Sequence, residues 1–196
     1  MNTSPVEEFE CQLANFFGAP YAVAVDSCTH GIELALRYTK ANMVSCPART
    51  YISIPFTFEK LGLQWCFDDY TWSGYYRIGN TNIIDAATYW RRGGYVGGTY
   101  MCLSFQFKKH LNLVRGGAIL LEKHEDYVAL KKMAHDGRIP NQLWKEQDID
   151  TIGYHYYMPI DTAQLGLERL PVACATEARV WTHEEYPYLP DIKVFR

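Results

Sequence analysis

The sequence has few of the features that mark several large classes of protein. Its longest apolar runs are far too short to span a bilayer, and its first ten residues carry acids without an apolar core. We therefore expect neither a membrane segment nor a secretory signal. None of its six cysteines form a C-x-x-C pair, so we expect no metal site, and free thiols suit the cytoplasm. A net charge of −3 with scattered lysines and arginines offers no surface for nucleic acid.

The chain does have enough apolar sequence to fold. It has 196 residues, of which 48% are hydrophobic, and no segment is of low complexity. We predict one domain over residues 1–196, in which residues from about 171 to 196 form an extended C-terminal arm. No internal repeat suggests an array of smaller units.

Hydrophobic periodicity predicts strands that alternate with helices in the first half of the chain. The predicted helices cover residues 5–17, 30–39, 51–61, 124–135 and 161–170, and the predicted strands cover 21–25, 43–46, 64–68, 75–78, 82–86, 100–105 and 118–121. This order indicates an α/β fold with a mainly parallel sheet. Ligands bind such sheets at the carboxyl ends of strands, where three polar clusters fall: residues 26–29, 85–88 and 104–109.

Taken singly, the residues of these clusters have ordinary explanations. Lys109 alone is better explained as a surface lysine. Asp85 could equally cap a helix, as could Ser27 and Thr29. Tyr51 alone fits a position in the core. Their order along the chain is what makes a shared site worth considering.

One motif is especially specific. Ser104-Phe105 is followed after three residues by Lys109, and Gly116-Gly117-Ala118 begins seven residues after that lysine. Lys108 fits neither spacing. With this motif the chain resembles the DegT/StrS family of sugar aminotransferases, which depend on pyridoxal phosphate (PLP).

Three further segments resemble the same family, so that the likeness extends over roughly residues 8 to 170. Residues 16–36 resemble its opening strand, phosphate loop and following helix. Ile84-Asp85-Ala86-Ala87 resembles its Glu-Asp-Ala-Ala motif, and residues 153–158 resemble its Gly-Tyr-Asn-Tyr-Arg-Met segment. The resemblance implies an aspartate aminotransferase-like large domain (fold type I), a three-layer sandwich, in a shortened form whose small C-terminal domain is missing or reduced.

The resemblance also implies roles for individual residues. Lys109 is the Schiff-base lysine and Asp85 is the partner of the ring nitrogen, and a PLP enzyme needs both groups. The expected cofactor contacts are Ser27, Cys28, Thr29, His30, Tyr51, Asp85, Thr88, Ser104, Lys109 and His155. Within this set, Ser104 and Thr29 contact the phosphate and Tyr51 stacks on the ring. For His30, which opens a predicted helix, a cap or loop contact is the simpler interpretation.

Several residues depart from the family pattern. Cys28 replaces the glycine of the loop, Thr88 replaces a His or Gln, and Tyr157 replaces an Arg. His155 replaces the Asn that reaches the phosphate of the neighbouring subunit in family dimers. Only a short connector joins Asp69 to Asp85, where the family has another strand and helix. The departures are compatible with cofactor binding, and they bear on the binding of substrate and hence on turnover.

The resemblance implies a homodimer with shared active sites that transfers an amino group from a donor such as glutamate to a nucleotide-linked keto sugar. Two alternatives stay open. The chain could bind PLP, or keep only the fold, and act as a non-catalytic binding or regulatory subunit. It could instead resemble the sugar dehydratases that use histidine in place of the lysine, although the spacing favours Lys109 over His110.

Overall fold

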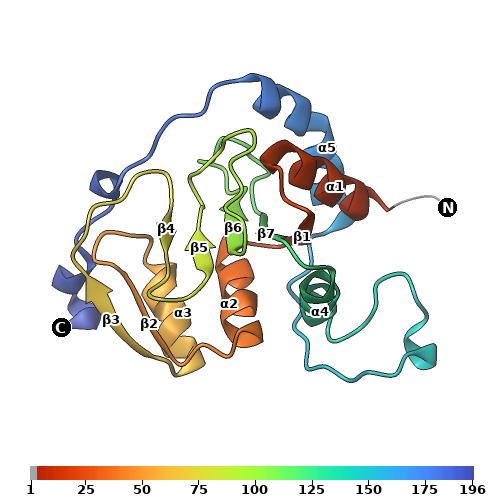
Figure 1. Cartoon of the computed structure of the whole chain (residues 1–196), viewed down its shortest axis with the longest axis horizontal. Helices are drawn as coiled ribbons and strands as arrows, with labels where there is room; N and C mark the ends of the chain where they lie inside the picture. Colours follow the sequence, from red (N-terminus) through yellow and green to blue (C-terminus); the bar gives the residue numbers. More distant parts are fainter. Residues whose placement is uncertain (1–3) are drawn as a thin grey trace.

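The computed structural model describes residues 4–196 (Figure 1). The first three residues of the N-terminal segment discussed above lie outside this range. The helices are α1 (Pro5–Phe17), α2 (Cys28–Tyr38), α3 (Ser53–Leu61), α4 (His124–Ala134) and α5 (Ile160–Ala175). The strands are β1 (Tyr21–Val25), β2 (Met43–Pro47), β3 (Gln64–Asp68), β4 (Tyr76–Arg77), β5 (Ile83–Asp85), β6 (Tyr100–Ser104) and β7 (Gly117–Leu121). Four short 3-10 turns complete the secondary structure: η1 (Trp144–Glu146), η2 (His183–Glu185), η3 (Leu189–Asp191) and η4 (Lys193–Phe195).

Helix α1 has the bounds that the sequence predicts, because both of its ends carry strong local signals. At its start, the Ser4 side chain accepts a hydrogen bond from the Glu7 amide, and the Glu7 carboxylate accepts one from the Ser4 amide. At its end, Gly18 adopts a left-handed conformation with φ of 74°, which glycine accepts without a steric penalty.

The strands form a mixed arrangement rather than the mainly parallel sheet that we predicted. Five strands pair in the order β1-β7-β6-β5-β4, and β2 pairs with β3 in a separate parallel pair. Strand β7 is antiparallel to both of its neighbours, and β4 is antiparallel to β5, whereas β5 and β6 are parallel. Consequently β1, β5 and β6 run in one direction, and their carboxyl ends meet at one edge of the sheet.

Helices cover both faces of this sheet, which gives the three layers that the resemblance implied (Figure 1). One apolar cluster joins α1 and α5 to Ala22 and Ala24 of β1. The other joins α2, α3 and α4 to Val23 and Val25 of the same strand. Alternate residues of one strand thus serve opposite cores, as strand geometry requires.

Two helices contain prolines, and the structure places their bounds differently from the prediction. Helix α3 begins at Ser53 rather than Tyr51, and Pro55 sits in its first turn, where a missing N–H costs nothing. Helix α5 continues through Pro171 to Ala175, although we expected it to end at Leu170. Ala173, beyond the proline, is buried with α1 in one apolar cluster, and this packing favours the longer helix.

The C-terminal arm, residues 176–196, therefore begins five residues later than we expected. It leaves α5, crosses the molecule and ends beside the β2–β3 pair (Figure 1). Its backbone pairs with the segment before β4: the Gly74 amide donates to the Trp181 carbonyl (2.8 Å) and the His183 amide to the Trp72 carbonyl (3.1 Å). Among residues 4–196, no helix has the length and apolar character needed to span a membrane.

Candidate functional site

A cavity lies at the edge where β1, β5 and β6 end. Its volume is about 610 Å³, within the usual range for small-molecule sites. The main cavity, as we call it, is lined by all three polar clusters that the sequence placed at strand ends. Eight of the ten predicted contacts line it: Ser27, Cys28, Thr29, Tyr51, Asp85, Thr88, Ser104 and Lys109.

The loop between β1 and α2 forms one side of the main cavity. Ser27 caps α2, since its side chain accepts a hydrogen bond from the His30 amide (3.2 Å). Helix α2 therefore begins at Cys28, two residues before its predicted start. Thr29 Oγ1 lies 2.8 Å from Ser53 Oγ at the start of α3. Two helix N-termini with hydroxyl side chains thus face the cavity, an arrangement that favours an anion such as phosphate.

The same loop explains the Gly-Gly sequence at the start of β7. A Cβ atom on Gly117 would lie 2.4 Å from the Cys28 nitrogen and 2.6 Å from the Ser27 carbonyl carbon. No side chain fits there, so glycine lets the loop rest directly on the sheet. The Cys28 thiol that replaces a family glycine is itself buried, and burial raises its pKa well above the ordinary value.

Asp85 lies at the end of β5 and is buried. Its Oδ1 accepts a hydrogen bond from the Ala87 amide (2.9 Å), and its Oδ2 accepts one from the Tyr76 hydroxyl (2.6 Å). Tyr76 stands directly opposite in the β4–β5 pair, and its hydroxyl is also 2.5 Å from Thr50 Oγ1. Burial raises the pKa of Asp85, and the two hydrogen bonds oppose that rise. A carboxylate with spare acceptor capacity in such a place suits a cationic N–H donor.

Lys109 follows β6 and faces the same cavity. Burial lowers the pKa of its ammonium, and the charge of Asp85 partly offsets the effect. Its Nζ lies 5.2 Å from the centre of the Trp181 ring, which belongs to the C-terminal arm. An amine whose pKa is depressed is more often neutral, which is the form that can act as a nucleophile. Lys108, its neighbour, is exposed.

The remaining predicted residues divide into two groups. Tyr51 (56% exposed), Thr88 and Ser104 line the cavity, and Thr88 Oγ1 donates to the Gly74 carbonyl (2.8 Å). Two predicted contacts do not line it. His30 is turned away by Asp26, which lies 2.6 Å from its Nδ1, and its ring stacks on Tyr156.

His155 is the second predicted contact outside the cavity. Its side chain is 71% exposed, and its Nδ1 lies 3.1 Å from Asp136 Oδ2. Within this chain, His155 therefore contacts no residue of the main cavity's polar clusters. The role that the resemblance implied for it requires a neighbouring subunit.

Sequence reasoning missed several residues of the cavity. Tyr76 lies in the strand that was predicted over residues 75–78, but nothing in the sequence indicated that its hydroxyl would contact Asp85. Trp72, Trp181, Glu185 and Tyr186 come from connecting segments, and the last three belong to the C-terminal arm. The sequence carried one usable signal for the arm, namely its concentration of aromatic residues, but nothing in it indicates which ones face the cavity.

The residues of the main cavity fit PLP. Asp85 would face the ring nitrogen, Lys109 the aldehyde carbon, and Tyr51 could cover the ring. The hydroxyls of Ser27, Thr29 and Ser104, with the amides at the start of α2, would surround the phosphate. The contact between Gly117 and the loop leaves no room for a side chain beneath this cradle.

A sequence comparison supports the family resemblance. Residues 1–73 match the model of the DegT/DnrJ/EryC1/StrS aminotransferase family. This stretch contains α1, β1, the loop between β1 and α2, α2, α3 and the β2–β3 pair. None of the curated proteins matches the chain in sequence.

Several solved structures, among them a putative sugar aminotransferase, share the fold. AtS13 from Actinomadura melliaura superposes with a TM-score of 0.75 at 23% identity, covering 86% of this chain and 60% of its own. The putative sugar aminotransferase Spr1654 from Streptococcus pneumoniae, in its PLP form, gives 0.72 at 17% identity, covering 89% and 60%. DesI, solved in the presence of its TDP-sugar product, gives 0.68 at 19% identity, covering 88% and 54%.

The chain spans about 60% of the length of the first of these structures. At such identities the likeness concerns the fold, and the family model adds the sequence match over residues 1–73. The family model therefore confirms the resemblance over residues 1–73, and the solved structures show that the chain shares their fold over most of its length.

Proposed function

We propose that this chain binds PLP and transfers an amino group from an amino acid to a keto sugar. The observation that carries the proposal is the placement of Lys109 and Asp85 in one cavity with a hydroxyl-lined pair of helix N-termini. Bound PLP supplies an electron sink for the bond-breaking steps. The structural neighbours solved in PLP and PMP forms, and with a TDP-sugar product, support the substrate class.

The residues of the cavity divide this work among them. Asp85 holds a positive charge at the ring nitrogen, because its buried carboxylate gains most from a cationic partner. Lys109 would hold the cofactor through its amine and, once the donor's amine has displaced it, the free Lys109 amine would accept a proton from the donor's α-carbon and return it. Its lowered pKa favours the neutral amine that this role needs. Ser27, Thr29 and Ser104 hold the phosphate in place.

We propose that the acceptor is nucleotide-linked and that glutamate is a suitable donor. We also propose a homodimer in the cytoplasm, in which His155 would reach the partner's cofactor. The exposed side chains of Phe107 (57%) and Val114 (67%), which flank the Lys109 loop, offer apolar area for such contact. The described cysteines are all unpaired, which suits a reducing compartment. Light scattering that finds only monomers in the presence of PLP would contradict the dimer.

Absorbance spectroscopy tests the cofactor and the chemistry together. The purified chain is mixed with PLP, beside Lys109→Ala and the control Lys193→Ala, at an exposed lysine that does not line the main cavity. We expect a visible band above that of free PLP in the wild type and in Lys193→Ala, and its absence in Lys109→Ala. Glutamate should then bleach the band. If the wild type gives no band, the chain acts without PLP, and a non-catalytic binding role takes the place of this proposal.

A further inference from the structure

A second, smaller cavity lies beside the main one and has no role so far. Its volume is about 180 Å³, and its lining includes Lys108, Lys109, His110 and Arg179 but no acidic residue. We call it the side cavity. A concave site lined by basic side chains, with no acidic residue in its lining, attracts a compact anion. Lys109 lines both cavities, so an anion here would lie next to the amine of the proposed chemistry.

Trp181 connects the side cavity to Lys109. It lines both cavities, and its ring centre lies 5.2 Å from Lys109 Nζ and 4.6 Å from Arg179 Cζ. Cations are attracted to the face of an indole ring at these distances. The Trp181 carbonyl accepts a hydrogen bond from the Gly74 amide, which holds this part of the arm to the body. Trp181 therefore keeps the Arg179 guanidinium near Lys109.

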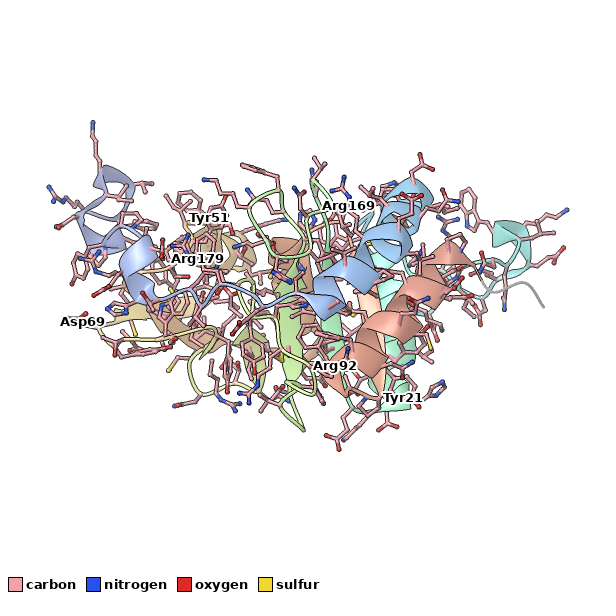
Figure 2. The ribbon with its side chains drawn as sticks, turned by 90° about the horizontal axis from the view of Figure 1, so that it is seen from above. Tyr21, Tyr51, Asp69, Arg92, Arg169 and Arg179 are labelled. Carbon is pink, nitrogen blue, oxygen red and sulfur yellow. The ribbon has the colours of Figure 1, made fainter. Side chains whose placement is uncertain are left out.

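Arg179 is already paired with a carboxylate of the arm. It donates a hydrogen bond to Glu185, and Glu185 in turn lines the main cavity. Their side chains are 61% and 32% exposed, so the pair is a surface ion pair of small net stability. A ligand carboxylate could replace Glu185 on the guanidinium at little cost. Figure 2 shows Arg179 where the arm crosses the molecule between α5 and the β2–β3 end.

We propose that the side cavity binds the carboxylate of the amino-acid donor, with Arg179 as its cationic partner and Glu185 as an internal carboxylate that occupies Arg179 until the donor arrives. This inference rests on the proposed function, since it assumes that a donor's amino group reaches Lys109. A carboxylate on the neighbouring carbon of such a donor would then lie close to the Lys109 amine. The volume of the side cavity suits a carboxylate and is too small for a nucleotide.

Calorimetric titration with glutarate tests the subsite without any reaction, because glutarate has two carboxylates and no amino group. The full chain, with and without PLP, is compared with Arg179→Gln, Glu185→Gln and the control Arg196→Gln. Arg196 pairs with Asp191 in the same arm (3.0 Å) but lines neither cavity. We expect Arg179→Gln to weaken glutarate binding by about tenfold or more, the value of a charge-assisted hydrogen bond.

The other variants sharpen the result. Glu185→Gln should tighten glutarate binding by about two- to fivefold, because it removes the competitor and costs only a surface pair. Arg196→Gln should leave it unchanged. If Glu185→Gln weakens binding as much as Arg179→Gln does, the pair only holds the arm in place and the proposal fails. It also fails if Arg179→Gln binds glutarate as well as the wild type does.

A second titration, with thymidine diphosphate, separates a carboxylate site from a phosphate site. We expect its affinity to be the same in the wild type and in Arg179→Gln; a selective loss in the variant would assign Arg179 to the nucleotide and overturn the proposal. If the chain gives a PLP band but does not bind glutarate, the proposed function is retained and only the proposed carboxylate site is rejected. If the chain binds glutarate but gives no absorbance band with PLP, the proposed function is rejected instead.

Discussion

The body of the molecule, residues 4–175, and the C-terminal arm differ in how much of their apolar surface is buried. The body has two apolar clusters, one on each face of the sheet. In the arm, only Leu189 belongs to the buried hydrophobic set, and its amide donates to the Ala48 carbonyl (2.8 Å). Near the end of the arm, Phe195 packs against the rings of Phe56, Trp65 and Phe67. The arm is thus attached at a few points, whereas the body is a continuous core.

The body and the arm also contribute different residues to the proposed site. The body supplies the groups assigned to the cofactor, such as Asp85 and Lys109. The arm supplies Trp181, Glu185 and Tyr186, which form the outer wall. Because a few anchors can change without disturbing a core, the arm is the part in which substrate preference can vary while cofactor binding persists.

Leu189→Ala should have the largest effect on this division. Leu→Ala at a buried site costs about 2–5 kcal/mol. Here we expect the lost free energy to destabilise only the arm, so that the arm detaches while the body stays folded. Hydrogen exchange should be faster at the Gly74 and His183 amides, because each of these amides donates a hydrogen bond between the arm and the body. Val194→Ala, at a position that is 62% exposed, is the control. Unfolding of the whole chain at once would mean that arm and body form one cooperative unit.

Gly117→Ala tests the body beside the phosphate loop. The added methyl group would meet the Cys28 nitrogen at 2.4 Å, and backbone must move to admit it. We expect the free energy of unfolding to fall by about 1–3 kcal/mol, the usual cost of overpacking. Gly97→Ala is the matched control, because a Cβ there has no neighbour within 4 Å. Urea denaturation measures both, and equal stabilities would contradict the close contact between β7 and the loop.

Asp85→Asn should give a smaller effect with a defined pH dependence. Burial raises the pKa of Asp85 above its ordinary 3.8, so the folded chain binds the proton more tightly than the unfolded chain does. Stability is therefore lost as pH rises from 3.8 through the folded pKa. Without PLP, Asp85→Asn should raise the free energy of unfolding at pH 7 by roughly 0.5–2 kcal/mol.

The gain should shrink as pH falls toward 3.8, and PLP binding should be weakened. Tyr76→Phe should act in the opposite direction and destabilise the chain at pH 7, because it removes a hydrogen bond from the carboxylate. Urea denaturation at several pH values measures both variants. A gain from Asp85→Asn that is constant with pH would show that ionisation of Asp85 is not its cause.

The sequence predicted the body far better than the arm, and the reason is physical. The strand at residues 21–25 was predicted with its observed bounds, since a strand buried on both faces reads as a continuous apolar run. The polar clusters at strand ends follow from topology, and the structure brings them into one cavity. Strand direction was less predictable: β7 runs antiparallel to both of its neighbours, and the hydrophobic pattern carries no signal for the direction of a strand.

Residues placed by tertiary contact escaped prediction. Tyr76 reaches Asp85 only because β4 pairs with β5, and the predicted strand at residues 75–78 carried no signal for which strand it would pair with. Trp181 reaches Lys109 only because the arm crosses the cavity. His30 was assigned to the cofactor by its place in a motif, whereas Asp26 and Tyr156 hold its ring elsewhere.

Peptide mapping after borohydride reduction tests the central claim most directly. The chain is incubated with PLP, reduced, digested and analysed by mass spectrometry, beside Lys109→Ala. Our account predicts that the added mass of the reduced cofactor appears on Lys109 in the wild type and is lost in the variant. The same mass on Lys108 or on scattered lysines, with no enrichment at Lys109, would contradict it.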